Sequence, residues 1–267
     1  MTFAELFKNK KPIIAMVHLP ALPGTPLYKP EEGIKKIISS ATKDIDALQA
    51  AGVDAIMFGN ENDRPYELKV NMASTATMAF VIGQVKNKIS IPFGVNVLWD
   101  PMSTIALAAA TGADFVREIF TGTYASDMGY WSPNAGKAMR YRNQLHREDL
   151  LMFFNISAEF AHSLDQRSLA DRAKSVTFSS LPDAVLVSGQ ITGESAKIND
   201  LESVKNVLPL TPVLANTGVK LDNVRDILGI ADGAIVGSSL KIDGNTWNEV
   251  DPERAKTFMD TVRKLRK

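Results

Sequence analysis

Polar residues that could do chemistry stand at the ends of short apolar runs along this 267-residue chain. They offer an imidazole and carboxylates for proton transfer, a guanidinium for stabilising negative charge, and amides for hydrogen bonding. Buried groups of these types are costly unless they pair with one another or with a ligand. Their recurrence therefore predicts one polar site assembled from distant parts of the chain. The candidate catalytic residues are His18, Glu61, Asp100, Arg117, Glu118 and Asn155.

Two of these assignments have alternatives that the residues alone leave open. His18 fits a general acid or base, and it fits a hydrogen-bonded core histidine equally well. Glu61, Asp100 and Glu118 could hold Mg²⁺ through oxygen ligands, or could instead form salt bridges with arginines such as Arg64. A requirement for Mg²⁺ is thus an open prediction, and no other cofactor is expected.

A second group of candidates surrounds glycines within Thr211–Lys241. Gly218 follows one apolar run, and Gly237, Ser238 and Ser239 follow the next. Glycine lets the backbone approach a ligand closely, and free N–H groups in such turns attract anions. Two such turns after consecutive strands predict a phosphate site, although both glycines could simply close tight turns. The candidate ligand-binding and phosphate-binding residues are Asn60, Asn96, Ser188, Gly189, Asn216, Gly218, Gly237, Ser238 and Ser239.

Eight short apolar segments alternate with segments of helical spacing, and this pattern predicts the fold. Near-continuous apolar strands separated by helices are typical of a parallel sheet covered by helices, and eight strands can close it. The sequence therefore predicts an α/β chain with one parallel eight-stranded (β/α)₈ TIM-barrel domain over residues 1–267, with an open doubly wound sheet as the rival fold. The predicted strands lie near residues 12, 54, 92, 114, 150, 183, 211 and 232.

The candidates lie where a barrel of this kind places its working residues, at the C-terminal strand ends and in the loops that follow. Neighbouring residues of a strand face opposite ways, so only one of Arg117 and Glu118 can point into the barrel unless the strand is already ending there. Which of the two does so is left open. None of the predicted strands ends in lysine, which argues against a Schiff-base aldolase.

The longest irregular stretch is Thr121–Pro133, after the fourth predicted strand. Long loops in compact domains are usually lids or binding loops, and two glycines in this one could serve as hinges. We expect it to cover the barrel mouth with Tyr124, Tyr130 or Trp131 near the ligand.

Composition excludes several classes of protein. The formal net charge is zero, so no basic face is expected to attract nucleic acid. The absence of cysteine excludes disulfides, thiolate zinc sites and cysteine nucleophiles. The basic N-terminus imitates a secretory signal only loosely, and no apolar run approaches the roughly 20 residues of a membrane helix. We therefore expect a cytoplasmic protein without membrane insertion, and leave open whether it forms a homo-oligomer.

Five segments together resemble the BtpA/SgcQ family: AMVHLPALPG, GVDAIMFGNEND, IPFGVNVLWDP, GADFVREIFTGTYASDMG and VLANTGV. The likeness runs over nearly the whole chain and is nearer to the SgcQ branch, found among bacterial sugar-utilisation genes, than to the branch named for photosystem I assembly. The resemblance implies a (β/α)₈ barrel, and some family members are described as nucleoside triphosphatases. This chain lacks the Gly-x-x-x-x-Gly-Lys-Ser/Thr motif, so P-loop chemistry is not expected.

Two functions follow from these observations. The favoured one is a cytoplasmic enzyme acting on a small phosphorylated metabolite, either a sugar phosphate or a nucleotide-derived compound. Its reaction would be that of a lyase, an isomerase or a phosphate-ester hydrolase. The alternative is a non-catalytic biogenesis factor of the photosystem I type that uses the barrel as a scaffold. The barrel mouth distinguishes them, because a scaffold has no reason to keep a polar cluster away from water.

Overall fold

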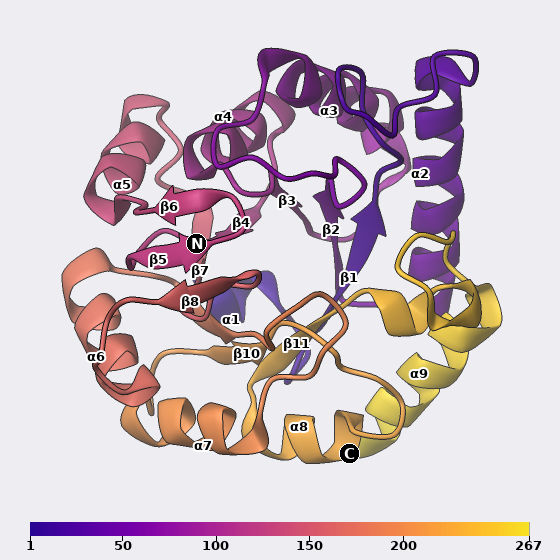
Figure 1. The fold of residues 1–267 in the computed structure, drawn as a ribbon. Coiled ribbons are helices and arrows are strands. Elements are labelled where there is room, and N and C mark those ends of the chain that lie inside the picture. The colour runs from indigo at the N-terminus through magenta and orange to yellow at the C-terminus, as the bar shows by residue number, and fades with distance from the viewer. Residues whose placement is uncertain (267) are drawn as a thin grey trace.

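Eight parallel strands close into a barrel surrounded by helices in the computed structural model, which describes residues 1–266 (Figure 1). Around the barrel the strand order is β1-β11-β10-β9-β7-β4-β3-β2. The predicted TIM barrel is confirmed, with each strand where the apolar runs placed it. The strands are β1 (Ile13–His18), β2 (Ala55–Gly59), β3 (Phe93–Asn96), β4 (Phe115–Glu118), β7 (Leu151–Asn155), β9 (Ala184–Val187), β10 (Val213–Ala215) and β11 (Gly233–Val236).

The surrounding helices follow the predicted alternation, and their ends carry the expected signals. The helix α4 begins at Pro101 and is capped by Gly112, whose φ is 72°. The sequence also predicts a final amphipathic helix over Pro252–Lys267, and its last residue, Lys267, lies outside the described residues. The main helices are α2 (Gly33–Ala51), α3 (Met72–Val85), α4 (Pro101–Thr111), α5 (Ala135–Gln144), α6 (Leu169–Ser180), α7 (Ile198–Val207), α8 (Val224–Ile230) and α9 (Pro252–Leu265).

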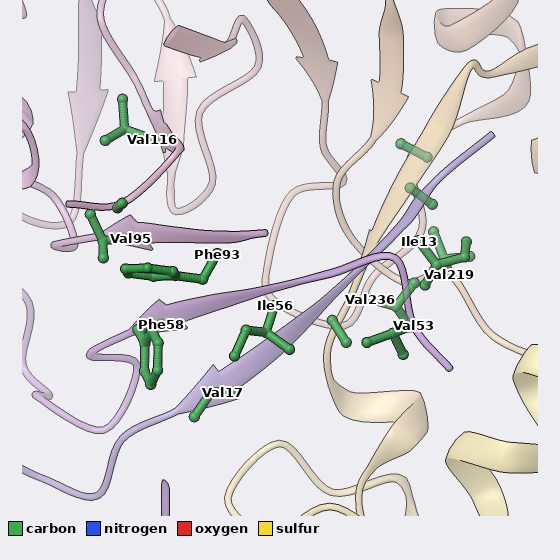
Figure 2. Close-up of a cluster of buried hydrophobic side chains, with 14 of the residues drawn as sticks. Ile13, Val17, Val53, Ile56, Phe58, Phe93, Val95, Val116, Val219 and Val236 are labelled. Atoms are coloured by element: carbon green, nitrogen blue, oxygen red, sulfur yellow. The ribbon is translucent and has the colours of Figure 1, made fainter. Parts of the chain in front are cut away.

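The strands are buried on both faces because their side chains alternate between two apolar layers. The outer layer lies between strands and helices, and Figure 2 shows part of it, including Ile56, Val95 and Val116. The inner layer fills the barrel. Its strand residues are Ile14, Met16, Ala55, Met57, Phe115, Leu151, Phe153, Ala184, Leu186, Leu214 and Ile235.

A short helix before the barrel, α1 (Phe3–Leu6), joins the inner layer. Leu6 and Phe7 belong to the same buried cluster as the inward strand residues, and Figure 1 shows α1 within the ring of strands. A capping box formed by Thr2 and Glu5 fixes the start of this helix. Sequence analysis missed α1, because four residues are too few to show a helical period.

The segment predicted as an irregular lid contains regular structure instead. It forms a hairpin from β5 (Tyr124–Ser126) and β6 (Gly129–Trp131), and β8 (Ala161–Ser163) pairs with β5 on its other edge. The result is a small antiparallel sheet after the ends of β4 and β7. The prediction of an irregular loop was wrong, because three-residue strands are too short for an alternating pattern to be recognised.

The segment 241–250, which follows β11, is fastened to α2 by a buried ion pair. Lys241 Nζ lies 2.8 Å from Asp44 Oδ2, and the two side chains are 1% and 2% exposed. The other carboxylate oxygen of Asp44 accepts a hydrogen bond from the Val250 backbone N–H at 2.7 Å. One carboxylate therefore holds both ends of the segment, which also pair with each other as an antiparallel bridge.

Replacing Lys241 by methionine should lower the free energy of unfolding by about 3–5 kcal/mol, because Asp44 would remain buried without a partner. Urea unfolding measures the change. The double variant Lys241→Met, Asp44→Asn removes both charges and keeps an acceptor for Val250, so it should recover much of the loss. Lys43→Met is the control, since the exposed Lys43–Glu249 pair should contribute only about 0–1 kcal/mol. Equal effects of the two single substitutions would contradict a structural role for the buried pair.

Candidate functional site

A polar layer covers the inner apolar layer at the C-terminal end of the barrel. Because alternate residues of a strand share a face, the residue two places beyond each innermost side chain points the same way. Those with polar side chains are all buried. In chain order the positions of this polar layer are His18, Gly59, Asn96, Arg117, Asn155, Ser188, Asn216 and Gly237.

A cavity of about 190 Å³ lies above this layer, with Met16 and Ile235 of the inner layer among its lining residues. Pockets for drug-sized ligands span about 300–1,000 Å³, so this cavity suits a smaller metabolite. Of the residues predicted from sequence, those that line it are His18, Glu61, Arg117, Asn216, Gly218, Gly237, Ser238 and Ser239.

Arg117, rather than Glu118, faces the cavity. Arg117 Nη2 lies 3.9 Å from Glu61 Oε1, and Arg117 Nη1 lies 3.7 Å from Glu159 Oε1. The guanidinium therefore stands between two carboxylates. Glu118 is absent from the cavity lining and instead accepts hydrogen bonds from the Asn96 side chain and the Ile119 N–H. The alternation of strand side chains explains the choice, since Phe115 of the same strand faces inward.

His18 and Glu61 form a buried pair at the base of the cavity. His18 Nε2 lies 3.4 Å from Glu61 Oε1, and His18 Nδ1 lies 3.3 Å from the Thr246 carbonyl oxygen. The Glu61 carboxylate folds back over Gly59, where a β-carbon would collide with both of its oxygens. Glycine at position 59 therefore leaves the space that Glu61 occupies.

A third carboxylate, Glu159, connects the loops on the far side of Arg117. Glu159 Oε2 accepts a hydrogen bond from the Thr192 hydroxyl at 3.1 Å, and Oε1 accepts one from Asn216 Nδ2 at 3.3 Å. Asn216 Nδ2 also donates to Ser188 Oγ at 2.7 Å, as does Asn155 Nδ2. The polar layer is thus internally connected on this side of the barrel.

Burial governs the protonation of these groups. It raises the pKa of Glu61 to about 7, with Arg117 opposing the shift. Burial likewise raises the pKa of Glu159 above its ordinary value and that of Glu118 to about 8. Burial, with the charge of Lys241, lowers the pKa of His18 well below its ordinary value. Near neutral pH the cavity therefore contains a neutral imidazole and a carboxyl group close to its own pKa, which suits proton transfer.

The two glycine turns form one wall of the cavity, and close packing requires glycine at positions 218 and 237. Gly218 has a φ of 61°, and a β-carbon there would collide with the backbone of Glu194 and Ser195. At Gly237, a β-carbon would lie 3.1 Å from the ring of His18. The turns therefore bring backbone close to other backbone and to the catalytic candidate His18.

Backbone N–H groups in these turns lack a hydrogen-bond partner in the described part of the chain. Among residues 1–266, no intramolecular acceptor pairs with the backbone N–H groups of residues 217–219 and 237–239. Lys220 and Arg254 line the same part of the cavity and supply positive charge. The Ser239 hydroxyl donates to the Val219 carbonyl at 2.9 Å and so connects the two turns.

The other residues predicted from sequence lie outside the cavity lining, where the structure gives them internal partners. Asp100 accepts from the N–H groups of Met102 and Ser103 as the N-cap of α4. Asn60 accepts from the Leu98 N–H at 2.8 Å, and Gly189 donates its N–H to Thr217 Oγ1 at 2.6 Å. Asn96, Asn155 and Ser188 take part in the hydrogen bonds described above. These residues support the site from below and beside it.

The structure bears on two further predictions, a Mg²⁺ site and an aromatic lid over the cavity. Within residues 1–266, no three His, Asp or Glu side chains gather in a way that could hold a metal ion. Mg²⁺ therefore stays a prediction.

The aromatic residues of the β5–β6 hairpin do not line the cavity; Trp131 instead packs against Trp99, with ring centroids 5.5 Å apart. Thr192 and Gly193, from the loop after β9, line the cavity in their place.

Sequence reasoning missed several residues of the cavity. Glu159 and Thr192 lie in loops, outside the strand-end positions that were searched. Trp99 lies next to the candidate Asp100 but was not among the candidates, and Arg254 lies on the final helix. An acidic residue four places after the end of β7 was visible in the sequence as a signal for Glu159. Only the tertiary structure brings Arg254 to the mouth.

Comparison with known proteins agrees on one family. The model of the BtpA family matches residues 9–264. The sgc region protein SgcQ of Escherichia coli strain K12 is 46% identical over 98% of both chains. The photosystem I biogenesis protein BtpA of Synechocystis is 31% identical, covering 98% of this chain and 91% of its own.

A solved structure supports the fold alone. Tryptophan synthase from M. tuberculosis, in its aminoacrylate-bound form, superposes with a TM-score of 0.58 at 16% identity, covering 97% of this chain and 95% of the other. Such low identity carries no information about the reaction. Among residues 1–266, no helix is both long and apolar enough to cross a membrane.

Replacing Glu61 by glutamine should change how stability depends on pH. With a folded pKa near 7 against 4.5 for the ordinary carboxyl, the folded parent binds more protons than the unfolded chain between those values. Glu61 therefore makes the parent lose stability as pH rises through this window, and Glu61→Gln removes that contribution. Between pH 5 and pH 8, the variant should gain about 2–3 kcal/mol relative to the parent, measured by urea unfolding. Glu148→Gln, at an exposed site, should show no such trend; a flat difference for Glu61→Gln would contradict the raised pKa.

Proposed function

The chain belongs to the BtpA family, and within it we propose that this protein is a cytoplasmic enzyme acting on a small phosphorylated metabolite at the barrel mouth. The observation that carries this proposal is that one cavity combines two parts with different chemistry. Its glycine-turn wall has free N–H groups beside Lys220 and Arg254, and its base holds buried groups suited to proton transfer. A phosphate would bind at the glycine-turn wall, and a reacting carbon or oxygen of the same ligand would lie beside the buried groups at the base.

The glycine-turn wall has the chemistry of a phosphate site. Backbone N–H groups that converge on one point bind anions without a side-chain charge, and nearby cations add to the attraction. A sugar phosphate or a nucleotide-derived compound would place its phosphate there. The small volume of the cavity favours the sugar phosphate, because a nucleobase would need further space.

The alternative is a non-catalytic biogenesis factor, and the name of the Synechocystis relative favours it. A scaffold would gain nothing from keeping Glu61, Arg117 and Glu159 buried around an open cavity. Each of these side chains is 6% exposed or less, and each would be cheaper as an apolar residue. The enzyme is therefore the better account of this arrangement.

Inorganic phosphate and ribose 5-phosphate should raise the melting temperature of the parent, since a ligand at about 100 times its Kd adds about 2.7 kcal/mol. Arg254→Ala and Ser239→Ala should each weaken binding by roughly five- to thirtyfold, corresponding to about 1–2 kcal/mol. Gly237→Val should abolish it, because the new side chain meets the His18 ring. Isothermal titration calorimetry measures the affinities.

The matched control is Lys256→Ala, which removes an exposed cation from the same helix as Arg254, away from the cavity lining. It should bind phosphate as the parent does. Equal affinities for the parent, Arg254→Ala and Ser239→Ala would remove the glycine turns as the phosphate site. No binding of any phosphorylated compound by the parent would overturn the proposed function.

A further inference from the structure

The contacts of His18 fix where its proton lies. The Thr246 carbonyl oxygen can only accept a hydrogen bond, so Nδ1 of His18 carries the hydrogen. A neutral ring then turns the lone pair of Nε2 toward Glu61 Oε1, 3.4 Å away. A favourable contact between these two atoms requires one proton between them. His18 and Glu61 therefore share a single proton when the cavity is empty of ligand.

Resting on the function proposed above, we infer that the ligand is a phosphorylated hydroxycarbonyl compound. In this inference Glu61 carries a proton between two adjacent carbons of the ligand, while Arg117 stabilises the ligand oxygen that becomes negative. Polar atoms around the cavity and the short distance between its two ends support this inference.

Two cavity residues offer acceptors and two offer donors. Glu61 Oε2 and Asn216 Oδ1 are buried acceptors without a hydrogen-bond partner among residues 1–266. Arg117 Nε and Trp99 Nε1 are buried donors that likewise have no partner within this range. A carbonyl oxygen matches a donor, and a hydroxyl group matches a donor and an acceptor together. A ligand with adjacent carbonyl and hydroxyl groups therefore fits this mixed set better than a purely anionic or purely apolar one.

The distance between the two ends of the cavity suits a short carbon chain. One edge of the His18 ring meets both ends: a β-carbon at Gly237 would lie 3.1 Å from Cε1 and 3.3 Å from Nε2, and Nε2 itself lies 3.4 Å from Glu61 Oε1. A phosphate held at the glycine turns thus places carbons only a few bonds away beside the Glu61 carboxylate. No large substrate is required to reach both ends.

The proposed step conserves atoms and electrons without a further reactant. Glu61 Oε2, as a carboxylate, takes the proton from the carbon that bears the hydroxyl group. The electron pair of the broken C–H bond forms a C=C bond, and the former carbonyl π pair moves onto its oxygen, beside Arg117. Glu61 returns the proton to the former carbonyl carbon, and the hydroxyl proton passes to the other oxygen. The result is the isomeric hydroxycarbonyl compound.

The charges that face the pair determine how the step depends on pH. Arg117 and Lys241 favour the Glu61 carboxylate, Glu159 opposes it, and the charge of Lys241 is balanced by Asp44. Burial of the carboxyl group outweighs the attraction of the two cations and raises the pKa of Glu61 to about 7. Because the base must be deprotonated, the rate of proton abstraction should rise with pH through about 7 and level off above it.

Proton transfer to carbon can be measured by NMR as incorporation of solvent deuterium in D₂O. The probes are dihydroxyacetone phosphate, ribose 5-phosphate and fructose 6-phosphate, with glycerol 3-phosphate as the matched compound that lacks a carbonyl group. The parent should exchange a carbon-bound hydrogen in at least one hydroxycarbonyl probe and none in glycerol 3-phosphate. Glu61→Gln should exchange on the order of 100- to 10,000-fold more slowly.

Binding is measured in parallel by calorimetry, which separates the two levels of the inference. Glu61→Gln should keep its affinity for inorganic phosphate, and Glu148→Gln should exchange as the parent does. If the probes bind to the parent but none exchanges, the proton-transfer inference is overturned and the phosphate-binding enzyme stands. If Glu61→Gln exchanges at the parent rate, Glu61 is not the base. If no phosphorylated probe binds, the proposed function falls as well.

A measurement without substrate checks the shared proton. In ¹⁵N spectra of the parent below about pH 7, His18 should appear as the neutral ring with hydrogen on Nδ1. A ring with hydrogen on Nε2, or a doubly protonated ring at pH 6, would overturn the sharing of one proton.

Discussion

Burial of charge at the C-terminal end of the barrel is the constraint on which the rest of the structure depends. Arg117, Glu61 and Glu159 are removed from water, where an unpaired charge is strongly unfavourable. Each therefore has partners from other strands and loops, so the positions of the loops are set by the needs of these charges. The apolar layers below could be formed by many sequences, whereas this layer permits few.

Glycine and a fastened segment make that layer possible. Gly59 leaves the space for the Glu61 carboxylate, and Gly237 leaves the space for the His18 ring. Thr246, which orients the ring, lies in the segment 241–250 that Asp44 holds at both ends. A helix on the outside of the barrel thereby fixes the tautomer of a side chain inside it. Support of this kind is as important to a site as the groups that react.

The barrel could be predicted from sequence because its signals are local and repeated. Short apolar runs marked every barrel strand, and Arg117 and His18 followed from their positions at strand ends. The helix α1 escaped because four residues are too few to show a helical period, and the β5–β6–β8 sheet escaped because its three-residue strands form no continuous apolar run. Glu159 and Arg254 escaped for a different reason: loops and a distant helix bring them to the cavity, and no local pattern records that approach.

The helix α1 gives the barrel a direction. Phe3 of this helix and Phe7 just after it pack against Phe153 and Phe115 at the end opposite the mouth, so they close that end of the barrel. For the enzyme proposed above, substrate and product would therefore enter and leave by the same opening. The Thr192 loop, which Glu159 holds through a hydrogen bond, lies at that opening. Product release past this loop would then affect turnover alongside the chemical step.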